Sequence, residues 1–166
     1  MRRALLRPPA RRAAAPWLAA LLTACGARPA PPLMPDDFTL QGVPVESDSA
    51  ELRLTFGAPD SVTLSDNPFT SDAPLATWHY DGFEIRFAGE STPAGYLVSE
   101  PGERTARGIG VGDPARLAIR LYGEPDARHA PSWTWIDDAD PTTLRVIDVV
   151  IAADTVRRLY IGRVVN

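Results

Sequence analysis

Two histidines, one cysteine, two recurring aspartates and one cluster of three aspartates are the side chains of this 166-residue chain that we consider first for chemistry. Nucleophilic catalysis needs a nucleophile, a base and an orienting group within reach of one another. The available bases of the usual type are His79 and His129. We expect His79 on the polar face of a hairpin beside Glu84, and His129 in a solvated loop. Neither position predicts a catalytic centre, and no nucleophile-elbow, zinc-protease or phosphate-binding motif is present.

Two aspartates recur at equivalent places. Asp60 and Asp126 each follow a Gly-x-Pro segment, where an aspartate most often makes a local hydrogen bond within a turn. The alternative is a pair of carboxylates that act as acid and base in an extracytoplasmic hydrolase.

Three more acidic residues, Asp137, Asp138 and Asp140, lie close together in the chain. A calcium loop needs several oxygen ligands at defined positions, usually with a glycine at the bend and a distal glutamate, and this segment has neither. We therefore expect an acidic turn there, with no metal and no other cofactor.

The one cysteine, Cys25, follows a leader that is typical of exported proteins. Residues 1–24 carry five arginines and no acid, and the apolar run 13–22 is about half the roughly 20 residues of a spanning helix. The sequence Leu-Thr-Ala-Cys at 22–25 resembles the bacterial lipobox, whose cysteine receives a diacylglycerol and becomes the new N-terminus. We therefore expect a lipoprotein signal peptide over 1–24 and lipidation of Cys25. The alternative is a buried free cysteine in an unprocessed leader.

A proline-rich segment follows the cysteine. Residues 26–37 contain four prolines, a composition that favours extended polyproline II over helix or central strand. We expect the lipidated cysteine and a tether to occupy 25–37, with the folded part beginning near Phe38. By resemblance to enterobacterial sorting, Gly26 favours the periplasmic face of the outer membrane over the inner membrane.

Charge limits the possible partners. From residue 25 onward the chain has 12 arginines and 21 acidic residues, a net charge of −9. Such a chain is a poor candidate for binding nucleic acid. Anionic headgroups would repel the chain as a whole, so the lipid itself must hold it on the membrane.

The part after the leader contains an imperfect repeat with an offset of 66 residues, between 42–60 and 108–126. Ser47 in the first copy and Asp113 in the second are N-cap types that precede a helix-compatible stretch. Pro114 is then the expected first helical residue. In both copies a glycine with a proline two residues later should end the helix after about ten residues.

Strands should follow each helix. The segments 76–80 and 83–88 flank Asp81-Gly82, which suits a two-residue hairpin turn. That turn sets the register, so Trp78 should lie opposite Ile85, with one face apolar and the other polar. Further strands are expected over residues 96–99, 133–136, 144–152 and 156–165.

The expected fold class is α+β, with two tandem helix-plus-antiparallel-meander repeats and the helices packed on one face of the sheet. The repeats would span 38–104 and 105–166. Because a unit of about 60 residues buries little surface by itself, the two copies should share one sheet or pack together.

Apolar residues of the second copy have two interpretations. Trp133 and Trp135 are two residues apart, so they should lie on one sheet face, either packed under the helices or exposed as an aromatic binding surface. The strand over 144–151 is apolar on both faces apart from Arg145 and Asp148, so it is central and covered twice or presents apolar surface to a partner. The candidate partner-binding residues are Trp133, Trp135, Val146, Val149 and Ile151.

Several short motifs together resemble a known family. A Thr-x-x-Gly-[Val/Ile]-x-Val lead-in, a short helix, [Phe/Tyr]-Gly-x-Pro-Asp and a Trp-x-[Tyr/Trp] strand occur at 39–60 with 78–80, and at 105–126 with 133–135. They resemble the BamE/SmpA-OmlA-like lipoproteins and the tandem-repeat fold of the β-lactamase inhibitor protein. The resemblance implies a helix-on-sheet protein-binding module, which in some members serves outer-membrane assembly.

The expected function is therefore a non-enzymatic, membrane-anchored protein-binding module of the cell envelope, with a lipid anchor and a protein partner. Two alternatives remain open. One is an extracytoplasmic hydrolase that uses carboxylates such as Asp60 and Asp126, and the other is a purely structural envelope lipoprotein.

Overall fold

The computed structural model describes residues 30–66, 74–89, 93–140 and 142–164. The expected signal peptide, Cys25 and the first part of the tether lie outside the described residues. No helix in the described part is long and apolar enough to cross a membrane.

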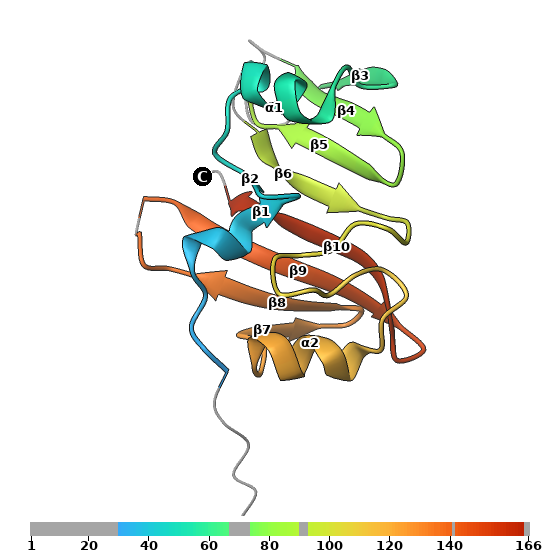
Figure 1. The fold of residues 1–166 in the computed structure, drawn as a ribbon. Helices are drawn as coiled ribbons and strands as arrows, with labels where there is room; N and C mark the ends of the chain where they lie inside the picture. The colour runs from blue at the N-terminus through green and yellow to red at the C-terminus, as the bar shows by residue number, and fades with distance from the viewer. Residues whose placement is uncertain (1–29, 67–73, 90–92, 141, 165–166) are drawn as a thin grey trace, which may run out of the picture.

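The expected α+β fold class is wrong, because the chain is mostly β (Figure 1). Eight strands form one continuous antiparallel sheet in the order β3-β4-β5-β6-β10-β9-β8-β7, and two more form a small separate sheet. Only two α-helices occur among the described residues, each eight residues long. The described elements are η1 (Pro35–Phe38), β1 (Thr39–Leu40), β2 (Val43–Pro44), α1 (Ser49–Phe56), β3 (Ser61–Ser65), β4 (Leu75–Tyr80), β5 (Phe83–Phe87), β6 (Pro93–Val98), α2 (Ala115–Tyr122), β7 (Ala127–His129), β8 (Ser132–Asp137), β9 (Leu144–Ala152) and β10 (Thr155–Val164).

Hydrogen bonding between distant strands is the physical reason for this difference. Strand β7 occupies a segment for which the sequence predicts a loop, and β3 occupies one for which no strand is predicted; each extends the sheet by one strand. In the middle, β6 pairs with β10, whose partners include Leu97 with Tyr160 and Gly95 with Gly162. That pairing satisfies the backbone groups of two strands that would otherwise be edges. The two halves therefore share one sheet, which is one of the two arrangements expected for the copies, but strands make up most of the described fold.

Helix α1 begins one residue later than predicted. The cap is Asp48 rather than Ser47, and its carboxylate accepts hydrogen bonds from the backbone N–H groups of Ala50 and Glu51 at 2.8 and 2.9 Å. The helix ends at Gly57, whose φ of 80° suits a residue without a Cβ.

The start of helix α2 also differs from the prediction. Pro114 is the N-cap rather than the first helical residue, and no side chain caps the helix. The carboxylate of Asp113 accepts instead from Arg104 at 2.7 Å and from the backbone N–H of Gly110 at 2.9 Å. The helix ends at Gly123 with a φ of 83°, so the predicted glycine stops are confirmed in both helices.

The predicted register of the β4–β5 hairpin is confirmed, because Trp78 pairs with Ile85 and His79 with Glu84. Trp78 and Ile85 are buried, whereas the side chains of the second pair are partly exposed. Strand β9 spans the predicted range, and the turn into β10 is made by Ala153 with a φ of 51° and by Asp154 with a φ of 57°.

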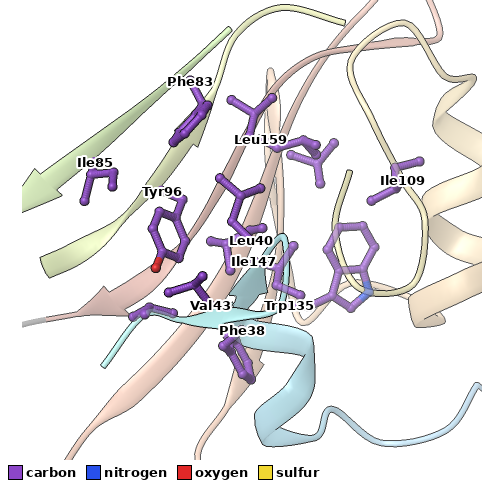
Figure 2. Packing of buried hydrophobic residues seen from close by; sticks show 14 of the residues in the cluster. Phe38, Leu40, Val43, Phe83, Ile85, Tyr96, Ile109, Trp135, Ile147 and Leu159 are labelled. Carbon is purple, nitrogen blue, oxygen red and sulfur yellow. The ribbon is translucent and has the colours of Figure 1, made fainter. Parts of the chain in front are cut away.

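One face of the sheet carries the hydrophobic core. Helix α1, helix α2 and the segment containing β1 and β2 all lie over this face (Figure 1). Figure 2 shows Phe38, Leu40 and Val43 of that segment among sheet residues such as Tyr96 and Ile147. We call this side the covered face, and the opposite side the open face.

Candidate functional site

His79 lies on the open face within a chain of polar contacts. Its Nε2 is 2.8 Å from the hydroxyl of Thr63, and its Nδ1 is 3.4 Å from a carboxylate oxygen of Glu84. Arg86 donates to the other oxygen of Glu84 at 3.2 Å. These residues sit on three adjacent strands of the sheet, and all are partly or fully exposed. The contacts fit a solvated cross-strand network, as the hairpin register predicts.

The two recurring aspartates do not share a site. Asp60 directly precedes β3 and Asp126 directly precedes β7, and these are the opposite edge strands of the sheet. Seven inter-strand spacings separate the edges, about 34 Å at about 4.8 Å each. The carboxylate of Asp126 accepts from the backbone N–H of Ile136 at 2.8 Å. A hydrolase that uses these two carboxylates as a pair has no support in this geometry.

The acidic turn after β8 is built from local bonds. Asp137 accepts from the backbone N–H of Ala139 at 3.1 Å and pairs with Arg145 at 3.2 Å. Asp140 accepts from both the backbone N–H and the hydroxyl of Thr142, which lowers the pKa of that carboxyl. Within the described ranges, no three acidic, histidine or cysteine side chains come together as a metal site.

The two candidate tryptophans of β8 both face the covered side. Trp135 is 2% exposed and its indole N–H donates to the carbonyl of Gly123 at 3.1 Å. Trp133 is partly buried against the core, and the guanidinium of Arg128 lies 4.8 Å from its ring centroid. Trp135 is therefore a core residue of this chain, and Trp133 borders the core.

The three candidate residues of β9 point to different faces. Val149 is fully buried in the core, and Ile151 packs against it from the same face. Val146 lies on the open face opposite Ile136, and is 8% exposed. The strand is central, between β10 and β8, but the helices cover only one of its faces.

The two charged residues of β9 are each satisfied locally. On the covered face, Arg145 binds Glu46 at 2.6 Å as well as Asp137. On the open face, the carboxylate of Asp148 accepts from the hydroxyls of Ser132 at 3.2 Å and Thr134 at 2.8 Å.

The centre of the open face is built around Tyr160. Gly95 and Gly162 pair directly beside it, and a Cβ added to Gly95 would lie 2.7 Å from Cζ of the tyrosine. The phenol end of the ring therefore lies over both glycines, and its hydroxyl donates to the carbonyl of Ala94 at 3.0 Å. Burial raises the pKa of Tyr160, so the hydroxyl keeps its proton and can donate it in the hydrogen bond.

Apolar side chains continue on both sides of this tyrosine. Leu97 pairs with Tyr160 across the strands, and Val146 pairs with Gly162 on the other flank. Farther out, Ile136 is 39% exposed and Val164 is 43% exposed. Leu97 and Val146 are themselves buried, at 7% and 8% exposure, so the apolar surface of the open face comes mainly from Ile136 and Val164. This surface lies beside polar residues such as those around His79, an arrangement that is also found at protein interfaces.

Val146 was among the residues predicted from the sequence, but Tyr160 and Leu97 were not. A signal was available, because isolated glycines inside strand patterns mark places where other groups approach the backbone closely. Gly95 and Gly162 are such residues, but only their pairing across two distant strands shows what approaches them.

Comparison with known proteins found no match for this chain among protein families, curated proteins or solved structures.

Proposed function

We propose that this protein is a lipid-anchored, extracytoplasmic protein-binding module that uses the open face of its eight-stranded sheet. The observation that carries the proposal is that this face bears no helix in the described part, yet exposes apolar side chains, with Ile136 39% and Val164 43% exposed beside the buried Leu97 and Val146. Tyrosine is enriched at interface hot spots because it combines a large apolar surface with a polar group.

The size of the open face suits a protein partner. Eight strands span about 34 Å, and six residues along a strand span about 20 Å, which gives about 700 Å². A stable protein–protein interface of standard size uses about 800 Å² on each partner. The motifs that resemble BamE/SmpA-OmlA-like lipoproteins also imply a protein-binding role.

Face-specific photocrosslinking tests the binding surface. A photocrosslinking amino acid replaces Ile136 or Val164 on the open face, or Arg116 on the exposed side of α2 as the matched control. We expect both open-face positions to give an adduct of the same mass in intact cells, and position 116 to give none. A Val164→Glu change should abolish the adduct formed from position 136. Equal adducts from all three positions, or none from any, would contradict the proposal.

The lipid anchor has its own test. A Cys25→Ser change should abolish globomycin-sensitive processing and move the protein from the membrane fraction to the soluble fraction. Unchanged retention in the membrane would refute the anchor without bearing on the binding face.

A further inference from the structure

Arg107 binds the segment that leads from the expected anchor into the fold. Its Nε and Nη2 donate to the two carboxylate oxygens of Asp37, each at 2.6 Å. Its guanidinium also donates to the carbonyls of Pro31 at 3.0 Å and Pro32 at 2.6 Å. Asp37 is 4% exposed, and its carboxylate also accepts from the backbone N–H of Met34 at 2.8 Å. Much of the described part of the expected tether is therefore fastened to the fold.

The same guanidinium also holds this segment against the end of helix α2. It donates to the carbonyl of Leu121 at 3.0 Å, and it lies 4.8 Å from the ring centroid of Tyr122. Ala30 lies beside the last turn, because a Cβ added to Gly123 would be 3.1 Å from the Cβ of Ala30. We call these contacts of Arg107 the clamp. The hydrogen bond to Asp37 is the main reason that the pKa of Arg107 is raised, so its guanidinium remains charged.

We propose that the clamp orients the protein on the bilayer, with the α2–β7 end facing an anionic lipid surface and the β3 edge pointing away. This inference rests on the proposed lipidation of Cys25. Five peptide units join Cys25 to Ala30, and they span at most about 18 Å. The sheet extends about 34 Å from β7 to β3, so the short tether can bring only the α2–β7 end close to the headgroups.

The charge distribution favours the same orientation. Residues 115–129, which form α2 and β7, carry three arginines and two acidic residues. Residues 45–66, which include α1 and β3, carry five acidic residues and one arginine. An anionic surface attracts the first end and repels the second, although the mature chain as a whole is acidic. In this orientation the sheet stands on its β7 edge, and the open face is accessible from the side.

Energy transfer from the protein to the membrane tests the orientation. The full lipoprotein is reconstituted into vesicles of phosphatidylethanolamine and phosphatidylglycerol that contain a headgroup-linked acceptor. A donor is attached to His129→Cys in β7 or to Ser65→Cys in β3, both exposed positions. Because the lipid occupies the sulfur of Cys25, the introduced cysteine is the free thiol. We expect transfer from position 129 to exceed transfer from position 65 at least about twofold, given the separation of about 34 Å.

Two clamp variants and one control show whether Arg107 sets this difference. Arg107→Ala removes the clamp, and Arg107→Lys keeps the charge but lacks the planar fork that binds several acceptors at once. Both should reduce the difference in transfer between the two positions while the protein still floats with the vesicles. Arg104→Ala is the matched control, because Arg104 binds Asp113 and the carbonyl of Gly108 rather than the tether. It should leave the difference unchanged.

Each outcome separates the orientation from the anchor. Flotation with equal transfer from both positions, or with stronger transfer from position 65, overturns the orientation alone. Loss of flotation overturns the anchor and the orientation together. An unchanged difference in both Arg107 variants, each still folded by circular dichroism, overturns the role of the clamp as a positioning device.

Discussion

A single methyl group added at Gly162 should destabilise the protein by about 2 to 3 kcal/mol. A Cβ at this position would collide with Cζ and Oη of Tyr160 and would lie 2.6 Å from the carbonyl oxygen of Ala94. The ring can move only by giving up its hydrogen bond to Ala94 and its packing on the glycine pair, and the backbone carbonyl is held in the sheet. Overpacking of well-packed sites typically costs about 1 to 3 kcal/mol, and two obstacles together place Gly162→Ala near the upper end.

Thermal unfolding followed by circular dichroism measures this cost. For a domain of this size, about 1 kcal/mol corresponds to about 3 °C, so Tm should fall by about 6 to 9 °C. Gly89→Ala is the matched control, because nothing lies within 4 Å of a Cβ at Gly89 and its φ is not in the left-handed region. Its Tm should stay within about 1 °C of the parent protein, as for a surface change.

The double variant Gly162→Ala with Tyr160→Ala identifies the source of the destabilisation. Removal of the ring takes away two of the three nearest contacts and keeps the one with Ala94, so part of the effect of the added methyl group should disappear in a double-mutant cycle. A Gly162→Ala protein with the Tm of the parent would refute the placement of the Tyr160 phenol over Gly162.

Three further changes address the core and one ion pair. Trp135→Ala should lower the free energy of unfolding by about 3 to 5 kcal/mol in urea titrations, because the side chain is 2% exposed in the core. Tyr96→Phe should lower it by about 1 kcal/mol, since the phenol donates to the carbonyl of Pro44 at 2.9 Å and the variant leaves that acceptor unpaired. The hydrogen bond from Arg104 lowers the pKa of Asp113 in the folded protein. The ionised carboxylate therefore stabilises the fold at pH values above its unfolded pKa of about 3.9, and this stabilisation is lost as the pH falls through the lower folded pKa. Asp113→Asn should therefore have a lower free energy of unfolding than the parent at pH 7, and the two free energies should become similar near pH 2.

Specific results would contradict each of these expectations. A small decrease in the free energy of unfolding of Trp135→Ala would mean that the tryptophan faces solvent or a partner. An unchanged stability for Tyr96→Phe would mean that the phenol bonds water instead of the backbone. A stability difference for Asp113→Asn that does not change with pH would show that the carboxylate acts through its shape rather than its charge.

Local chemistry made part of this fold predictable. The Asp-Gly pair between β4 and β5 dictates a two-residue turn, and that turn alone sets which residues of the hairpin lie opposite each other. The glycines at 57 and 123 end both helices because they adopt a positive φ at low cost. The helix starts were misplaced by one residue because adjacent residues can compete as caps, and only their bonds decide between them.

The candidate site was less predictable. Alternation of apolar residues shows that a strand has two faces, but not which of them the helices cover. Val146 and Val149 look alike in the sequence, yet the first lies on the open face and the second in the core. The fold class failed for a related reason, since short segments such as β3 and β7 become strands only when a neighbouring strand offers its edge.

By itself, the sequence determined the features that depend on neighbours along the chain: the hairpin register, the helix ends, the acidic turn and the leader pattern that predicts export. Tertiary structure alone decided the features that join distant segments. Tyr160 reaches Ala94 across 66 residues, and Arg107 reaches Asp37 across 70. Contacts at such separations must offset a loop-closure entropy that local turns do not incur, and they form only when the whole sheet assembles around them. The open face and the clamp both depend on such contacts, so neither could be predicted from local patterns.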